Sequence, residues 1–283
     1  MSVEVSDSSE LRPVRGPSAL GGGWRRSWEL LQLIAVTDFK KVYFGTALGY
    51  LWSLARPLML FGVLLAVFTQ IFRIGSEVPE YPVLLLFNIV LFGFFSEATN
   101  TAVQSIVGQE AIVRKTQFPR LVIPLAVVLT ALFNLGLNLV VVFVFILAWG
   151  IAPEWSWLGF PLIVVALFVV TTAVSMIVSS LYPRFRDTAI IWGVLATVLF
   201  YGTPVLYPLE IVPDTLRDVI GVNPLAPLFE LARLWVIDPT APGPVDAAGG
   251  FVHLLPAIVI YVAVCAFSVW VFRREAPRIA EQL

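Results

Sequence analysis

The chain has 283 residues, of which 59% are apolar and only 13% are charged, and its mean hydropathy is +0.90. Soluble domains are near half apolar and a quarter charged, so this composition predicts a polytopic, all-α integral membrane protein. The formal net charge of −1 argues against a nucleic-acid partner. With a single histidine, His253, and a single cysteine, Cys265, the chain has no His/Cys cluster for a metal and no internal disulfide.

The N-terminal region divides into a polar tail and an amphipathic helix. Residues 1–23 are polar and rich in proline and glycine, which predicts a disordered cytosolic tail. Residues 24–44 place Trp28, Leu31 and Ala35 at helical spacing on one face and Glu29 and Lys40 on another. This pattern is typical of a helix that lies in the headgroup layer. The alternative is a poor membrane span, although its longest charge-free run is too short to cross.

Six apolar runs follow, and each approaches or exceeds the ~20 residues needed to cross ~30 Å of hydrocarbon. They cover residues of about 50–72, 82–107, 121–149, 157–181, 189–207 and 252–272. The segments on one side of these runs hold fifteen lysines and arginines, counting Arg56 near the entrance of the first run, against three on the other side. This asymmetry predicts that both termini are cytosolic, including the C-terminal tail at 275–283.

A short charged segment separates the second and third spans. Residues 109–117 are predicted to form a small amphipathic helix, with Ile112 and Val113 on one side and charged side chains around the rest. Phe118 and Pro119 end it, because proline lacks the N–H and crowds the preceding turn. On the cytosolic side such a helix would let a soluble partner push on the membrane helices. The alternative is a basic loop that only sets the topology.

The region between the fifth and sixth spans contains two short apolar stretches, 216–222 and 225–236, separated by Asn223 and Pro224. Neither stretch can span a bilayer, yet both are too apolar for a free loop. We expect either two half-helices that dip back into the outer leaflet, shielded by protein, or a folded cap on the helix ends. Pro204 and Pro208, each next to a threonine or tyrosine, would let the fifth span bend into this pair.

Few residues inside the spans carry chemistry. Glu97 is the only acid deep in an apolar run, and an intramembrane carboxylate is a functional candidate by default. Without a second buried acid or histidine to pass on a proton, we favour a packing or pore-lining contact over a proton relay. Asn134 and Asn138 lie four residues apart on one helix face, where they would bond a neighbouring helix or line a wet channel. Asp187, after the cytosolic arginines of the turn between spans four and five, is placed to cap the next helix.

Four stretches, taken in this order and spacing, resemble the membrane subunits of type-2 ABC exporters that move O-antigen polysaccharide and teichoic acid. They read KKVYFGTALGYLWSLARPLM, IVRKTQFPRLVIPL, RFRDTAIIWGVLATVLFYGTPVLYPLEIVP and NPLAPLFELARLWV. The resemblance covers about residues 24–274. It implies a homodimer with a lipid-linked polysaccharide crossing between the two copies, and two cytosolic ATPase subunits that bind Mg-ATP. No GxxxxGK[ST] loop occurs in the chain, so the ATP site would lie on the partner.

The resemblance also assigns roles to residues. It implies an interface helix at 24–44, a coupling helix at 109–117 and external gate helices at 216–236, in a bacterial plasma-membrane protein surrounded by lipid. The ATPase-coupling residues would be Gln109, Glu110, Arg114, Lys115, Phe118 and Arg120, beside a charged cytosolic turn of Arg184, Arg186 and Asp187. The channel candidates are Tyr43, Phe44, Trp52, Glu97, Asn134 and Asn138, and the external gate candidates are Pro204, Tyr207, Asn223 and Pro224. No catalytic residue, metal or cofactor is expected in this chain.

Two other interpretations remain open from the sequence. A type-2 ABC exporter of drugs or small lipids would have the same fold and a different cargo. An integral membrane glycosyltransferase would need acids at a membrane face to hold a metal and activate an acceptor, and here the external acids are scattered. A proton-coupled transporter would need several buried ionisable groups or inverted repeats, and neither is evident.

Overall fold

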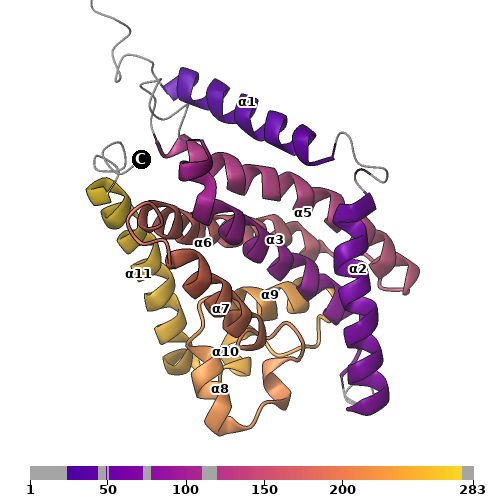
Figure 1. Cartoon of the computed structure of the whole chain (residues 1–283). Coiled ribbons are helices and arrows are strands. Elements are labelled where there is room, and N and C mark those ends of the chain that lie inside the picture. The colour runs from indigo at the N-terminus through magenta and orange to yellow at the C-terminus, as the bar shows by residue number, and fades with distance from the viewer. Residues whose placement is uncertain (1–23, 44–48, 50, 73–77, 110–119, 276–283) are drawn as a thin grey trace, which may run out of the picture.

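The computed structural model describes residues 24–43, 49, 51–72, 78–109 and 120–275, and all regular elements in these ranges are helices (Figure 1). The all-helical prediction is therefore confirmed for this part of the chain. The helices are α1 (Trp24–Tyr43), α2 (Leu51–Ala66), α3 (Tyr81–Gly108), α5 (Val122–Ala148), α6 (Phe160–Leu181), α7 (Thr188–Tyr201), α8 (Asp214–Gly221), α9 (Ala226–Val236), α10 (Pro244–Ala247) and α11 (Phe251–Glu275). A π-helical turn, Val67–Ile71, extends α2, and 3-10 turns lie at Trp155–Gly159 and Leu209–Ile211.

Five helical stretches are long and apolar enough to cross a membrane: Leu51–Ile71, Tyr81–Gly108, Val122–Ala148, Trp155–Leu181 and Phe251–Glu275. They correspond to the first, second, third, fourth and sixth predicted spans. The fifth predicted span differs. Its helix, α7, has 14 residues, fewer than the ~20 that a perpendicular span needs.

α3 is the centre of the bundle, where it packs against α2, α5, α6 and α7 (Figure 1). The first half of its sequence, YPVLLLFNIVLFGFF, is apolar on all sides of the helix. Such a helix is stable only when other helices surround it. Tyr81, Phe87 and Phe95 are accordingly among the largest fully buried side chains of the protein.

The amphipathic helix α1 lies across α5 (Figure 1). Leu31 and Ala35, two members of the predicted apolar face, are buried against Val122 and Ala126 of α5. The Thr130 hydroxyl of α5 donates a hydrogen bond to the Ala35 carbonyl at 3.2 Å. Trp28, on the same predicted face, stays 46% exposed. The contact with α5 thus occupies only part of that face.

The predicted end of the fifth span near Tyr207 is wrong, since α7 stops at Tyr201. Two prolines, Pro204 and Pro208, lack the N–H that a continuing helix needs. Residues 203–206 are nevertheless buried, so the chain around Pro204 packs against the protein interior. The chain therefore leaves α7 as a compact irregular segment, residues 202–208, which we call the α7 break.

Two short helices follow the α7 break, as predicted. α8 and α9 are joined at the Asn223–Pro224 turn and bend by 95° relative to each other. α9 packs on α6, and α8 packs on the start of α11. There the Asp218 carboxylate lies 2.8 Å from Nδ1 of His253. The pair is therefore folded onto the helix bundle.

Gly159 marks a close contact between the turn before α6 and helix α9. A Cβ atom at this position would lie 2.5 Å from two ring carbons of Trp235, and the neighbouring Ser156 hydroxyl donates to the Trp235 carbonyl at 2.7 Å. Any side chain must therefore push Trp235 and α9 away from the bundle. We expect Gly159→Ala to lower the free energy of unfolding by about 1–3 kcal/mol, measured as a lower thermal midpoint in mild detergent.

The matched control is Gly62→Ala in α2, where an added Cβ meets no atom within 4 Å. It should leave the midpoint unchanged or raise it slightly, because alanine favours helix over glycine. An equal midpoint for Gly159→Ala and the native chain would contradict the proposed packing of α9 against this turn.

Candidate functional site

The central helix α3 exposes a stripe made only of glycines and polar residues. Its exposed positions are Gly93, Glu97, Asn100, Thr101, Gln104 and Gly108. Their spacing of three and four residues places them on one side of the helix. The other residues of α3 are buried or half-buried, and most of them are apolar. We call these six residues the polar stripe.

Four residues of the polar stripe, Gly93, Glu97, Asn100 and Thr101, line a groove with a volume of about 780 Å³, together with apolar residues of α3 such as Phe92 and Phe94. α2, α5 and α7 supply the other walls. Of the predicted channel residues, Trp52, Glu97 and Asn138 line the groove. Asn134 is buried immediately behind it. The side chain of Tyr43 and all of Phe44 lie outside the described residues.

Glu97 is held in place by α5. The Asn134 amide donates to the Glu97 carboxylate at 2.6 Å, and the Asn138 amide donates to the Asn134 carbonyl at 2.9 Å. A carboxylate that accepts such a bond has a fixed orientation in the groove wall. Asn134 therefore joins two helices, while Asn138 faces the groove. The structure brings together these three residues, which the sequence could place only on separate spans.

The groove wall presents hydrogen-bond acceptors. The amide group of Asn100 donates to the Ser96 carbonyl at 2.7 Å, as the amide group of Asn138 does to Asn134. The side-chain oxygens of Asn100 and Asn138 remain available to a molecule in the groove, beside the Glu97 carboxylate. Acceptors of this kind suit a ligand rich in hydroxyl groups.

Aromatic rings from two helices line the groove. Trp52 on α2 is 52% exposed, and Tyr201 at the end of α7 is 60% exposed. Phe200 also lines the groove and packs edge-on against Phe92, with ring centroids 5.2 Å apart. Tyr201 is not among the predicted channel residues. Its position in the groove wall is a feature that the one-dimensional pattern could not show.

Several backbone carbonyl groups of the α7 break accept hydrogen bonds from side chains of other elements. The Tyr81 hydroxyl donates to the Leu206 carbonyl at 2.9 Å, and the Asn88 amide donates to the Pro204 carbonyl at 3.0 Å. The Asn223 amide donates to the Gly202 carbonyl at 3.0 Å and to the Thr203 hydroxyl at 2.7 Å. Irregular backbone at membrane depth is tolerated only when protein or water satisfies it in this way.

Three of the four predicted gate residues meet in this region. Pro204 and Asn223 are bonded as described, and the Tyr207 hydroxyl donates back to the Tyr201 carbonyl at 2.6 Å. Pro224 lies at the turn between α8 and α9, where the Leu225 N–H donates to the Asn223 side chain at 2.9 Å. Sequence reasoning did not identify Asn88, which lies in the apolar first half of the second predicted span, or Tyr81, which directly precedes that span.

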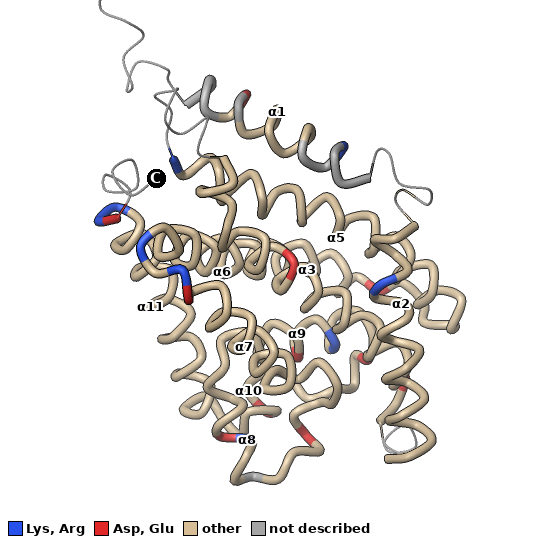
Figure 2. The backbone as a smooth tube through the Cα atoms, viewed as in Figure 1, with Lys and Arg blue, Asp and Glu red and all other residues tan. Residues whose placement is uncertain are grey.

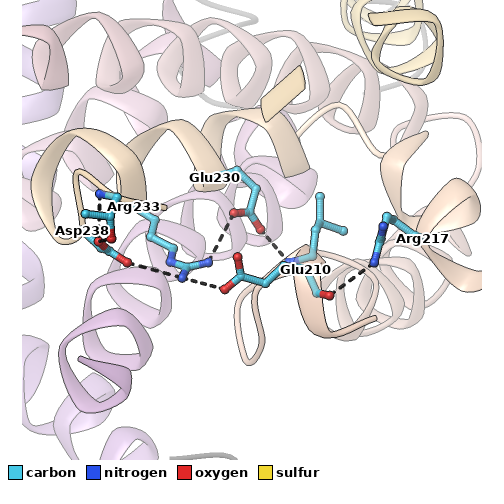
Figure 3. A network of polar contacts seen from close by, with 7 residues as sticks. Glu210, Arg217, Glu230, Arg233 and Asp238 are labelled. Carbon is cyan, nitrogen blue, oxygen red and sulfur yellow. Dashed lines mark hydrogen bonds and ion pairs between the residues drawn. The ribbon is translucent and has the colours of Figure 1, made fainter. Parts of the chain in front are cut away.

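An ionic cluster ties α9 to the segment that follows the α7 break (Figure 3). Arg233 lies 2.8 Å from Glu210, 3.7 Å from Asp238 and 3.9 Å from Glu230. The Glu230 carboxylate also accepts the Leu209 N–H at 2.8 Å. Glu230 and Arg233 are each only 2% exposed, so their charges depend on one another. The spacing of Glu230 and Arg233, three residues apart in a short apolar helix, is the sequence signal that could have revealed this cluster.

The similarity search gives the family of the chain. Residues 29–235 match the model of the ABC-2 type transporter family. The chain belongs to this family. It is 33% identical over 203 residues to an O-antigen export system permease protein RfbA of Klebsiella pneumoniae, covering 71% of this chain and 78% of that protein.

Two further relatives support the same family. An O-antigen export system permease protein RfbA of Myxococcus xanthus is 30% identical over 202 residues, covering 71% of this chain and 77% of that protein. The polysialic acid transport protein KpsM of Escherichia coli is 22% identical over 191 residues, covering 66% of this chain and 72% of that protein. Together with the apolar helices, this makes the chain an integral membrane transport protein.

Many charged residues of this ABC-2 chain lie at helix ends, while α3 and α9 also carry charged residues within the bundle (Figure 2). Gln109 caps the end of α3, and Arg120 precedes α5. Of the predicted coupling residues, Glu110, Arg114, Lys115 and Phe118 lie outside the described part of the chain. The coupling helix therefore stays a prediction.

The turn between α6 and α7 differs from its prediction in one respect. Asp187 precedes α7, but its side chain makes no capping hydrogen bond, so that expectation is wrong. The Asp187 carbonyl instead accepts the Ile191 N–H at 2.9 Å, as in a helix that has already begun. Arg184 and Arg186 lie over the rings of Phe185 and Tyr182 at 5.1 Å and 5.0 Å. Both cations are therefore held at the surface by aromatic contacts.

Within the described ranges, no group of three or more histidine, cysteine, aspartate or glutamate side chains is placed to hold one metal ion. The ionic cluster contains three carboxylates, but Arg233 occupies its centre (Figure 3).

The ionic cluster yields a stability prediction. Arg233→Met removes the guanidinium that lies 3.9 Å from the buried Glu230 carboxylate. We expect it to lower the free energy of unfolding by about 3–5 kcal/mol, because an unpaired charge then remains buried. The measurement is the thermal midpoint of the purified protein in mild detergent.

The double variant Arg233→Met plus Glu230→Gln is the matched control. A glutamine at position 230 keeps an acceptor for the Leu209 N–H and carries no charge, so the double variant should be more stable than Arg233→Met alone. If Arg233→Met unfolds at the native midpoint, the cluster does not hold α9 in place.

Proposed function

We propose that this chain is the membrane permease subunit of an ATP-driven exporter that moves a lipid-linked polysaccharide across the bacterial plasma membrane. The polar stripe carries this proposal. A helix that is buried elsewhere exposes only glycine, hydroxyl, amide and carboxyl groups over its second half. Such a surface is unfavourable in contact with lipid and suits a water-filled path. The names of the relatives, which describe O-antigen export permeases and polysialic acid transport, support the cargo class.

The conduit forms between two copies of the chain. The polar stripe and the groove lie on an outer side of the single chain, since Glu97 and Asn100 are exposed. A second copy that faces this side would cover both stripes and enclose a path between two grooves. The amide oxygens of Asn100 and Asn138 would then accept bonds from sugar hydroxyls, while Trp52 and Tyr201 offer rings for stacking.

ATP is bound by two partner ATPase subunits, which hold the Mg-ATP. The chain itself has no phosphate-binding GxxxxGK[ST] loop. The coupling helix at 109–117 directly follows α3 and directly precedes α5, the two helices that carry Glu97 and Asn134. Motion at this helix would therefore reach the groove through the helices that build it.

The membrane orientation follows from the charges. In Figure 2 most basic segments lie near the end where α5 begins and α11 ends, and acidic segments lie toward α8 and α10. The basic side would be cytosolic, with both termini and the interface helix α1 there. α8, α9 and the α7 break would then form a re-entrant outer gate, which opens when the polymer passes.

A co-purification experiment tests whether the chain binds a partner ATPase. The native permease, solubilised in mild detergent, should retain a Walker-type ATPase, and Arg114→Glu plus Lys115→Glu should lose it because the coupling helix would then repel its partner. Arg273→Glu plus Arg274→Glu, which reverses the same number of exposed charges at the end of α11, is the matched control and should retain the ATPase.

Depletion of the native permease should in addition trap lipid-linked glycans inside the cell, as measured by lipid extraction and mass spectrometry. If no ATPase accompanies the native chain under any mild condition, the export proposal loses its source of energy and is wrong.

A further inference from the structure

Arg56 is the cation of the groove. It lies in the second turn of α2, one helical turn after Trp52, and both side chains line the groove. No other lysine or arginine contributes to the groove wall among the described residues. The residue is exposed in the single chain, so its guanidinium is open to a molecule that enters the groove.

Among the residues that the structure describes, none forms an ion pair with Arg56. Glu97 attracts it electrostatically from the facing wall, yet the two side chains form no ion pair within 4 Å. The Glu97 carboxylate is instead bonded to Asn134 at 2.6 Å. Among the described residues, no other acid lines the groove. The five N–H donors of the guanidinium are therefore available to a ligand.

An arginine inside an apolar helix is costly unless an anion or water satisfies it. Its planar fork matches the oxygens of a phosphoryl group, which it binds through two parallel hydrogen bonds. The facing wall offers the opposite chemistry, because Glu97, Asn100 and Asn138 present acceptors that suit hydroxyl groups and repel anions. The groove therefore has one position for an anion, beside a wall suited to neutral sugars.

We propose that Arg56 binds the phosphoryl group that links the lipid to the glycan, and that the sugars of the cargo are uncharged. This inference rests on the proposed export function. A polymer with a carboxylate or phosphate on every repeat would require cations along the whole path, whereas the described residues that line the groove include one cation, Arg56, and one carboxylate, Glu97. A single anionic linkage at the end of a neutral polymer matches this distribution of charge.

The test uses the full-length permease with its partner ATPase in nanodiscs of phosphatidylcholine. Native mass spectrometry measures the binding of undecaprenyl diphosphate and of undecaprenol, which differ only in the phosphoryl groups. We expect the diphosphate to bind more than tenfold more tightly to the native protein. Arg56→Gln should weaken diphosphate binding by roughly tenfold and leave undecaprenol binding unchanged. Arg273→Gln, which removes an exposed charge far from the groove, should bind like the native protein.

Arg56→Lys provides a second variant if the glutamine variant does not fold. It keeps the charge but loses the planar fork, so diphosphate binding should weaken severalfold. Equal binding of diphosphate by the native protein and by either variant would overturn the proposal. Equal binding of the diphosphate and undecaprenol by the native protein would overturn it as well.

Competitors distinguish the source of the phosphoryl group and the charge of the sugars. Phosphatidylglycerol or free inorganic diphosphate, each at the same concentration, should not displace undecaprenyl diphosphate. If either does so fully, Arg56 binds general lipid headgroups or soluble anions, and the proposal is wrong. Oligosialic acid should bind no better than a neutral oligosaccharide of equal length, and stronger Arg56-dependent binding of the acidic oligomer would contradict the assignment of an uncharged glycan.

The assignment of Arg56 and the export proposal can fail independently of each other. If the ATPase co-purifies and glycans accumulate on depletion, but Arg56→Gln binds and exports normally, only the assignment of Arg56 fails. If undecaprenyl diphosphate binds through Arg56 while no ATPase accompanies the chain, the anion site stands and the ATP-driven function fails.

Discussion

The backbone of the α7 break must find hydrogen-bond partners inside the protein, and the rest of the structure depends on this constraint. Unbonded carbonyl groups at membrane depth cost several kcal/mol each. Tyr81 and Asn88 of α3 bond two of these carbonyl groups, and Asn223 bonds a third. α3 must therefore lie at the centre, within reach of the break, and the turn between α8 and α9 must fold back onto it.

The same helix serves both candidate functional regions. Asn88 on α3 supports the α7 break, and Glu97, about 13 Å further along the helix axis, belongs to the polar stripe. A shift of α3 along its axis would change the groove and strain the bonds at the break together. This arrangement gives a physical reason for motion at the C-terminal end of α3 to reach α8 and α9 without a separate mechanical link.

Much of the fold could be predicted from the sequence, because membrane helices are recognised by their length and apolar composition. The first four spans, the last span and the two short external helices all appear close to their expected bounds. The predicted end of the fifth span was wrong, since an apolar run does not show where backbone carbonyl groups accept hydrogen bonds from side chains instead of continuing a helix. The capping role of Asp187 was wrong for a similar reason, because helical geometry had already begun at that residue.

The candidate site was predictable only in part. Glu97 stood out as a lone acid, and Asn134 and Asn138 as polar residues on one face, but their contact joins residues from different helices. Tyr81 and Asn88 carried no local signal strong enough to separate them from ordinary span residues. Their partners lie far away in the chain: Tyr81 and Leu206, for example, are 125 residues apart. Such pairs follow from the packing of helices, which periodicity along one segment does not determine.

The most direct test of the account is the water accessibility of α3 in the native membrane. With Cys265 replaced by serine, single cysteines at positions 93, 97, 100 and 104 would report on the polar stripe, and cysteines at 94, 98 and 102 on the buried face. Labelling with a hydrophilic maleimide should be strong at the first set and weak at the second. Uniform labelling, or labelling confined to the buried positions, would contradict the claim that this stripe lines the aqueous path of the transporter.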